Sequence, residues 1–139
     1  MANAVPQLHD YLLESAQRLP DKVALACRGE RLTYGEIDAR SNALAHALID
    51  RGVARGDRVV VLAENGAPAV ISFWAALKAN AVVSVVSPET RVEKLAYLLN
   101  DCRARALVTE GRLARVFAHA AMRAPHLAAV IVSGEIDGE

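Results

Sequence analysis

The stretch that decides the fold is Arg58-Val59-Val60-Val61-Leu62-Ala63, residues 58–63. Its apolar residues follow one another without alternation, which is typical of a strand buried on both faces of a sheet. Further apolar strands are predicted at residues 81–86, 106–109 and 127–133. Helices are predicted between them, from Pro68 to about Ala79, from Thr90 onward, and from Leu113 to Met122. This alternation predicts an α/β fold, a mostly parallel sheet with flanking helices joined by right-handed crossovers.

A helix and a hairpin are predicted before this alternation. Residues 8–19 carry apolar side chains at helical spacing, and Pro20 ends that helix because proline cannot continue its hydrogen-bond ladder. Residues 23–27 and 31–33 are predicted to form two short strands joined by a tight turn at residues 28–30.

Helix ends carry further signals. Thr33 with Glu36, and Thr90 with Glu93, have the spacing of a capping box, in which each side chain accepts from the other residue's backbone amide. Gly52 and Asn80 are predicted to end helices, because both residue types adopt the left-handed conformation at low cost.

Composition narrows the classes of function. The chain has 139 residues, enough for one domain with a core, and its 16 basic and 16 acidic side chains give a net charge of +0. That balance argues against nucleic acid or an anionic membrane as the main partner. The longest apolar stretch, residues 67–77, is too short to span a bilayer, and residues 1–6 do not resemble a signal peptide. We therefore expect a cytoplasmic protein.

Known catalytic and binding motifs are absent from the sequence. It contains no dinucleotide-binding Gly-x-Gly-x-x-Gly, no Gly-x-x-x-x-Gly-Lys-Ser/Thr phosphate loop and no Gly-x-Ser-x-Gly nucleophile elbow. Asp57 precedes its strand, which disfavours a phospho-receiver domain. Cys27 and Cys102 lack zinc-ligand spacing and are predicted to be reduced core residues. The four histidines have no apparent catalytic partner: His9, His46, His119 and His126.

In an open α/β sheet, ligands gather at the carboxyl ends of the strands. The corresponding loops here are Glu64-Asn65-Gly66, Ser87-Pro88-Glu89-Thr90 and Glu110-Gly111. Their residue types are also those of ordinary loops and helix caps, and we favour that interpretation. From the residues alone, the chain is an α/β domain with no assembled active site.

The order of several short motifs is more specific than any one of them. The chain contains Leu32-Thr33-Tyr34-Gly35-Glu36-Ile37, Ser41-Asn42-Ala43-Leu44-Ala45, Gly52-Val53-Ala54-Arg55-Gly56-Asp57-Arg58-Val59, Trp74-Ala75-Ala76-Leu77-Lys78-Ala79-Asn80-Ala81-Val82 and Tyr97-Leu98-Leu99-Asn100-Asp101. In this order they resemble the N-terminal region of the adenylate-forming (AMP-binding) superfamily, which includes acyl-CoA synthetases and peptide-synthetase adenylation domains. Residues 8–12 and 20–25 resemble that family's opening helix and first strand. The sequence departs from the family pattern at Asn80, Val85 and Ser87.

The resemblance implies a two-step reaction in the complete enzyme. A carboxylic acid and ATP, with Mg²⁺, form acyl-AMP and pyrophosphate, and the thiol of coenzyme A or of a carrier then displaces AMP. The family's phosphate loop, its acidic magnesium residues and its C-terminal lysine do not occur in this sequence; Ser133-Gly134-Glu135 is not that loop. No catalytic, cofactor-binding or metal residue is therefore assigned.

The resemblance leaves three hypotheses open. Residues 1–139 are expected to be the N-terminal part of the large domain of an AMP-forming acid–thiol ligase, inactive alone. Alternatively, the chain is half of a split ligase that needs a partner chain carrying the rest. The third hypothesis is a non-enzymatic α/β binding module. That module would fold alone and retain some affinity for an acyl group or a nucleotide. ATP, Mg²⁺ and coenzyme A are implied for the complete enzyme, and none of them is assigned to residues of this chain.

Overall fold

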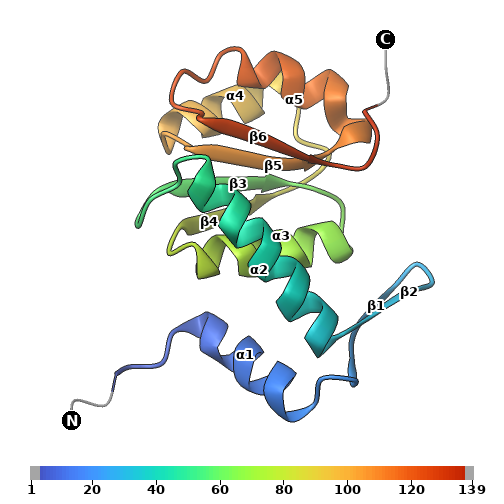
Figure 1. Ribbon diagram of the computed structural model, residues 1–139. Helices are drawn as coiled ribbons and strands as arrows, with labels where there is room; N and C mark the ends of the chain where they lie inside the picture. Colours follow the sequence, from blue (N-terminus) through green and yellow to red (C-terminus); the bar gives the residue numbers. More distant parts are fainter. Residues whose placement is uncertain (1–3, 137–139) are drawn as a thin grey trace.

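Four parallel strands form the central sheet of the computed structural model, which describes residues 4–136 (Figure 1). They are β3 (Arg58–Leu62), β4 (Val82–Val86), β5 (Ala106–Glu110) and β6 (Ala129–Ser133), in the order β4-β3-β5-β6. The two inner strands, β3 and β5, are the most deeply buried, with Val59 and Leu62 of β3 at 0% exposure. The predicted parallel α/β fold is confirmed, and the unbroken apolar run at residues 59–63 lies in the middle of the sheet as expected.

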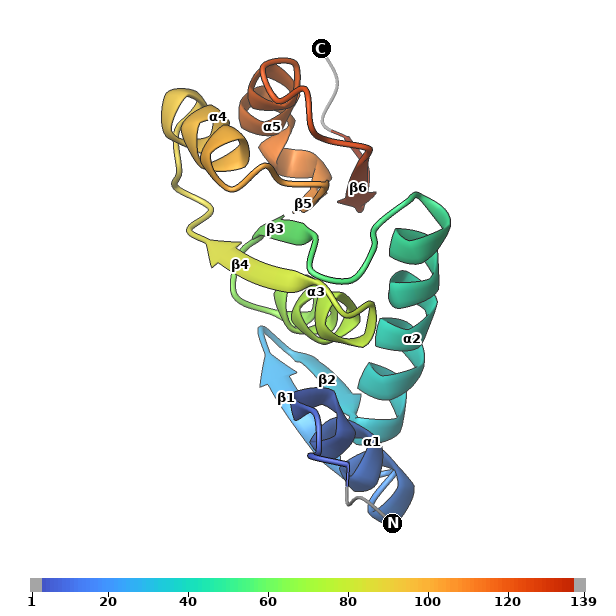
Figure 2. The ribbon, with the colours of Figure 1, turned by 90° about the vertical axis from the view of Figure 1, so that its left-hand side faces the viewer.

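Helices cover both faces of this sheet (Figure 2). The helices α4 (Val92–Asp101) and α5 (Ala114–Ala121) lie on one face, over a core that includes Leu62, Leu95 and Leu107. On the other face, α2 (Tyr34–Asp50) and α3 (Ala67–Lys78) pack over a second core built largely of valine and alanine. Small alanine side chains let α3 approach the sheet closely, so that Ala75 and Ala76 are fully buried.

The N-terminal helix and hairpin sit beside this layered unit. They comprise α1 (Leu8–Arg18), β1 (Val23–Cys27) and β2 (Glu30–Thr33), and the two strands pair antiparallel. Arg28 and Gly29 form the hairpin turn with φ of 51° and 82°, as the predicted tight turn requires. A third apolar cluster joins this part to α2 and α3 through Leu12, Leu32 and Ile37.

Most predicted helix ends are confirmed, and one is wrong. The Thr33–Glu36 capping box forms, and Asn80 takes the left-handed conformation at φ 58°. The box predicted for Thr90 and Glu93 does not form, because α4 begins at Val92 with Arg91 as its N-cap. The Thr90 amide instead closes a turn onto the Ser87 carbonyl at 3.0 Å. The Glu93 carboxylate turns toward Arg123, at 2.8 Å.

Two smaller expectations are also corrected. The helix predicted from residue 113 is preceded by a 3-10 turn, η1 (Gly111–Leu113), and α5 itself starts at Ala114. Cys27 and Cys102 are free thiols, but both are half-buried and not part of the deep core. Burial raises the pKa of the Cys102 thiol. Within residues 4–136, no helix has the length and apolar character needed to cross a membrane.

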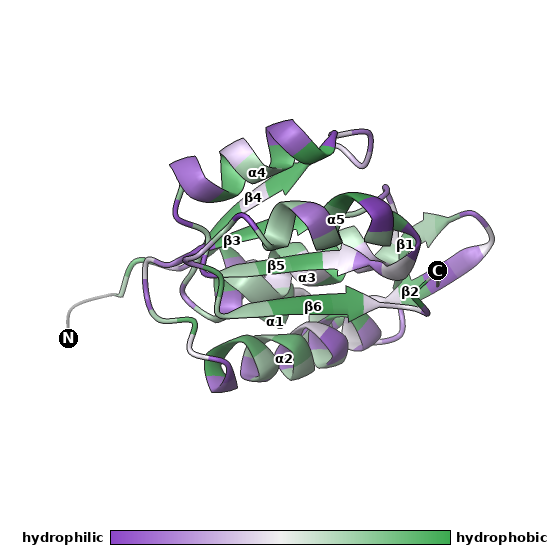
Figure 3. Cartoon of the chain, turned by 90° about the horizontal axis from the view of Figure 1, so that it is seen from above, coloured by the Kyte–Doolittle hydropathy of each residue, from purple (hydrophilic) through white to green (hydrophobic). Residues whose placement is uncertain are grey.

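The hydropathy of the chain follows this layering (Figure 3). The strands β5 and β6 are hydrophobic over most of their length, whereas α2 carries polar residues on the side turned away from the sheet.

The two outer strands of the sheet are less covered than the central ones. Val82 and Val85 of β4 are 51% and 54% exposed, and Val130 of β6 is 37% exposed.

Candidate functional site

The strand order creates a switch point at the carboxyl edge of the sheet. The chain leaves β3 through α3 on one face, and it leaves the neighbouring strand β5 through α5 on the other. The loops after β3 and β5 therefore diverge, and open α/β sheets bind ligands in the crevice that such divergence leaves. A ligand site of this fold class is therefore expected at this edge.

Four charged side chains of the chain itself fill this edge, and we call them the carboxyl-edge network: Arg28, Glu64, Glu110 and Arg112. The Glu64 amide donates to the Glu110 carboxylate at 2.7 Å. Arg112 pairs with both carboxylates, at 2.9 Å to Glu64 and 3.1 Å to Glu110. Arg28, at the hairpin turn, donates to the other Glu64 oxygen at 2.5 Å. The network thus ties the hairpin to the ends of β3 and β5.

Each charge in the network has a partner of opposite sign. The hydrogen bond from Arg28 lowers the pKa of Glu64, against the opposing effect of burial, and the nearby Arg112 lowers it further. The same hydrogen bond raises the pKa of Arg28. Two arginines and two glutamates therefore form a group at this edge whose charges are paired and sum to zero.

Such a group does not fit the phosphates or the magnesium of a nucleotide. Phosphates are held by uncompensated positive charge, and Mg²⁺ needs free carboxylate or carbonyl oxygens. Here each arginine is paired with a carboxylate, and Glu110 also accepts from a backbone amide. Residues 4–136 contain no group of three His, Cys, Asp or Glu side chains that could hold a metal ion.

Of the three loops singled out in the sequence, the structure brings two together. Glu64 and Glu110 meet in the carboxyl-edge network, whereas residues 87–90 form a separate turn after β4. Sequence reasoning missed Arg28, because it lies 36 residues from Glu64 in a turn that carries no chemical signal. Arg112 was visible two residues after Glu110, but nothing in the pattern separated it from other surface arginines.

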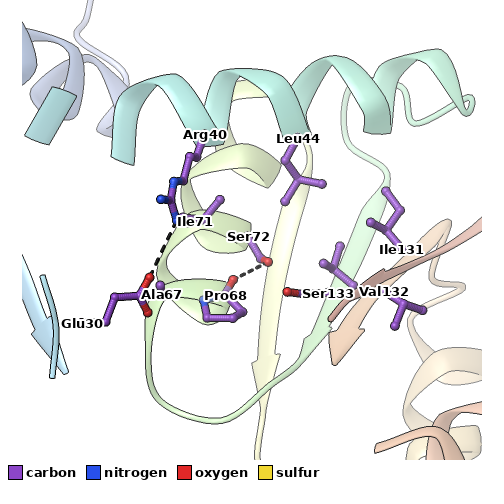
Figure 4. Close-up of a pocket in the computed structure, with 11 residues that line it drawn as sticks. Glu30, Arg40, Leu44, Ala67, Pro68, Ile71, Ser72, Ile131, Val132 and Ser133 are labelled. Carbon is purple, nitrogen blue, oxygen red and sulfur yellow. Dashed lines mark hydrogen bonds and ion pairs between the residues drawn. The ribbon is translucent and has the colours of Figure 1, made fainter. Parts of the chain in front are cut away.

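A second feature lies on the α2/α3 face, where α2 and α3 leave part of β5 and β6 uncovered (Figure 4). It is a hollow of about 370 Å³, which we call the β6 groove. Its apolar lining includes Leu44 of α2, Ile71 of α3 and Ile131 of β6. The ion pair between Arg40 and Glu30, at 3.8 Å, lies at the end nearest the hairpin. The full lining is Glu30, Arg40, Leu44, Ala67, Pro68, Ile71, Ser72, Val108, Ile131, Val132 and Ser133.

Comparison with known proteins identifies the architecture. The chain is 35% identical, over 123 residues, to a medium/long-chain-fatty-acid–CoA/3-oxocholest-4-en-26-oate–CoA ligase of Mycobacterium marinum. The matched segment covers 88% of this chain and 22% of that protein. The chain is 32% identical over 107 residues to bacitracin synthase 1 of Bacillus licheniformis, covering 77% of this chain and 2% of the synthase. The crystal structure of the anthranilate CoA ligase AuaEII with anthranoyl-AMP superposes with a TM-score of 0.87 at 25% identity.

The chain spans only a small share of these relatives. The superposition with AuaEII covers 96% of this chain but 27% of that ligase. Nearly all of the described structure is therefore shared with a larger fold, and the family profile of the AMP-binding enzyme matches residues 12–137. The resemblance predicted from the ordered motifs is confirmed, and the chain belongs to the AMP-binding enzyme family.

Proposed function

We propose that residues 1–139 are the N-terminal part of the large domain of an AMP-forming acid–thiol ligase. In the complete enzyme, a carboxylic acid and ATP form acyl-AMP and pyrophosphate, with Mg²⁺ assisting, and a thiol then takes the acyl group. The observation that carries the proposal is the superposition with a CoA ligase whose structure contains an acyl adenylate, anthranoyl-AMP. That compound belongs to the class of intermediate that the first step forms.

The proposal assigns this chain a supporting role. Its carboxyl-edge network is neutral and paired, so it supplies neither a cation for phosphate nor a free carboxylate for Mg²⁺. ATP, Mg²⁺ and the thiol would be bound by residues of the remaining part of the ligase, and the isolated chain would be inactive. We place the complete enzyme in the cytoplasm.

Coenzyme A is the thiol we favour over a carrier-bound pantetheine. The match to the M. marinum CoA ligase extends over 88% of this chain, whereas the match to the bacitracin synthase extends over 77%. The AuaEII structure is also that of a CoA ligase. An acid of the fatty-acid class follows from the same M. marinum relative and is the first substrate to try.

ATP–pyrophosphate exchange tests the proposal directly. The 139-residue chain, assayed with octanoate, palmitate, benzoate and anthranilate, is expected to show no exchange above background. A chimera of the M. marinum ligase, with its aligned segment replaced by this chain, is expected to exchange pyrophosphate and to release acyl-CoA. Exchange by the isolated chain would contradict the claim that it is inactive alone. A folded chimera without exchange would remove the proposed function.

A split ligase with a separate partner chain is the second candidate. The open β6 groove favours it, because an uncovered apolar hollow is a common feature of a surface that another polypeptide covers. Exchange activity that appears only on mixing with the remaining part of the ligase would support it. The binding-module hypothesis predicts that the isolated chain binds AMP, and calorimetric titration with AMP that gives no heat would remove it.

A further inference from the structure

The outer edge of β4 lacks the devices that usually protect an edge strand. Within residues 4–136, β4 pairs with β3 alone and lies at the opposite end of the sheet from β6 (Figure 2). Its sequence, Val82-Val83-Ser84-Val85-Val86, reads the same in both directions and contains no charged residue and no proline. Its register with β3 is regular over the whole strand, so no bulge bends it away. An edge without such protection tends to pair with another strand.

The backbone of β4 presents two residues to this edge. The Val82 amide donates to the Asp57 carbonyl at 2.8 Å, on the side of β3. Because successive residues of a strand point to alternate sides, Ser84 also turns its amide and carbonyl toward β3. Val83 and Val85 turn these groups outward. The edge therefore offers an unpaired donor and acceptor at two positions, one on either side of Ser84.

This arrangement fits an antiparallel copy of itself. With a two-fold axis through Ser84, Val83 of one chain faces Val85 of the other, and both carry outward amides and carbonyls. Such a pair exchanges two N–H···O bonds, and the symmetry repeats the pair on the other side of the axis. A shift of the register by one residue would place outward groups opposite inward ones, so these bonds would be lost.

The neighbouring helix α4 carries charges that match this symmetry. One flank of α4 faces the end of α5, since Glu93 and Asn100 both bond to Arg123. The helix α5 connects β5 to β6, so the other flank of α4 is turned toward the outer edge of β4. Helical spacing places Lys94 and Asp101 together on that flank, and both side chains are exposed.

The same two-fold axis brings these charges into opposite pairs. The helix α4 runs antiparallel to β4, because β4 and β5 are parallel, and both elements are roughly 15 Å long. The axis through Ser84 therefore passes near the middle of α4, and it sets α4 beside its copy in the opposite direction. Lys94 of each chain then faces Asp101 of the other. A parallel arrangement would instead set equal charges opposite each other.

We infer that the outer edge of β4 and the charged flank of α4 bind a second copy of this chain, as a two-fold dimer with one continuous sheet. The inference does not depend on the proposed function, because it uses only this outer surface. Val85, whose side chain is 54% exposed, is one of the positions at which the sequence departs from its family's pattern. The dimer is therefore inferred for this chain and not for its relatives.

Disulfide cross-linking of the 139-residue chain tests the surface and its register. All variants carry Cys27→Ser and Cys102→Ala, with one new cysteine from Ser84→Cys on the axis or Val85→Cys beside it. In this dimer the two Ser84 Cα atoms lie about 4.5 Å apart, within the range of a disulfide, whereas the two Val85 Cα atoms lie roughly 9 Å apart, beyond it. With oxidised glutathione, Ser84→Cys should form a covalent dimer at least about tenfold faster than Val85→Cys.

The outcomes distinguish a second copy from other occupants of this edge. Equal rates for Ser84→Cys and Val85→Cys would indicate random collision and would overturn the inference. A covalent dimer from Val130→Cys on β6, in place of one from Ser84→Cys, would show pairing through the other edge and would also overturn it. The M. marinum chimera with Ser84→Cys should cross-link as well. A folded chimera that does not cross-link would show that another segment of the ligase covers β4, and the inference would fail.

Sedimentation equilibrium measures the dimer without a cross-link. Val85→Lys adds a charge to the edge at an exposed position and should raise the dissociation constant of the dimer at least about tenfold. Met122→Lys is the control, because it adds the same charge at the end of α5, at a position that is 87% exposed. It should leave the constant unchanged. A parent chain that stays monomeric, or equal constants for these two variants, would refute the dimer.

A charge swap tests the pairing of the two α4 helices. Lys94→Asp alone sets two carboxylates opposite each other and should raise the dissociation constant by about fivefold. Adding Asp101→Lys restores opposite charges and should return the constant to that of the parent. A further loss in the double variant would contradict the antiparallel placement of α4 beside its copy.

Discussion

Replacing Lys78 with methionine tests how the two helices that wall the β6 groove are held together. Lys78 ends α3, and its ammonium donates to two groups of Asp38 on α2, the carboxylate at 2.6 Å and the carbonyl at 3.2 Å. It also reaches the Ser41 hydroxyl at 2.8 Å and the Asn42 amide oxygen at 2.7 Å. The two charged side chains are only 11% and 18% exposed, so water replaces these contacts poorly.

The loss in the free energy of unfolding of Lys78→Met follows from this geometry. A hydrogen bond to a charged group contributes about 1.5–3 kcal/mol, and loss of one partner of a fully buried pair costs roughly 3–5 kcal/mol. Because Asp38 keeps some contact with water, we expect Lys78→Met to lower the free energy of unfolding by about 2–3 kcal/mol. A chain of this length has an unfolding entropy of roughly 0.3 kcal/mol/K, so the melting temperature should fall by about 7–10 °C.

Thermal and urea unfolding, followed by circular dichroism, measure this loss. Lys94→Met is the control, since Lys94 is exposed on α4, and it should change the free energy by less than about 0.5 kcal/mol. Adding Asp38→Asn to Lys78→Met should recover about 1 kcal/mol, because no unpaired carboxylate then remains. A cost for Lys78→Met equal to that of Lys94→Met would refute the reasoning and would mean that the ammonium is solvated.

Three further changes probe the strand ends. Thr109→Val should raise the free energy of unfolding by about 1 kcal/mol, because Thr109 is 1% exposed and its hydroxyl has no hydrogen-bond partner in the described chain; urea unfolding measures it. Gly111→Ala should displace the segment after β6, since a Cβ there would lie 1.7 Å from the Glu135 carbonyl oxygen, and faster amide exchange at residues 134–136 would report it. Glu64→Gln should destabilise the chain above the ordinary glutamate pKa of about 4.3, and the difference from the parent should vanish as pH falls through the lowered pKa of Glu64.

Each of these changes has an outcome that would contradict it. A loss of stability in Thr109→Val would mean that the hydroxyl does have a partner, and Thr109→Ser then separates that partner from packing. Gly29→Ala is the control for Gly111→Ala, because a Cβ at Gly29 would meet nothing within 4 Å while its φ is 82°, so only backbone strain should appear there. For Glu64, a difference that grows toward acid would reverse the sign expected for a carboxyl with a lowered pKa.

The sheet could be predicted from the sequence because its signals are local. A strand buried on both faces is apolar over its buried length, so residues 59–63 identify an inner strand of the sheet without any knowledge of their neighbours. Gly52 and Asn80 mark helix ends for a similar reason, since a left-handed backbone restricts the residue type at a single position. The Thr33–Glu36 capping box involves residues three apart and formed as expected.

The errors arose where a distant contact competed with a local one. Thr90 and Glu93 have the same spacing as Thr33 and Glu36, yet Arg123 attracts the Glu93 carboxylate and the preceding turn holds Thr90. The Arg28–Glu64 pair and the β6 groove depend on which strands lie side by side, and spacing along the chain does not carry that information. Contacts between residues far apart in the sequence therefore explain both the missing Thr90–Glu93 capping box and the composition of the candidate site.

Besides the outer edge of β4, two places on the sheet could hold a ligand or a partner: the carboxyl edge and the outer edge of β6. They differ in charge and in polarity, and the difference bears on function. At the carboxyl edge, the chain pairs its own charges and ties the hairpin to β3 and β5. At β6, an uncharged edge strand borders a groove whose lining is largely apolar. A nucleotide needs unpaired charge, whereas another part of the same fold needs apolar surface and free backbone groups. The chain offers the second and not the first, as expected of a support on which the rest of a ligase assembles.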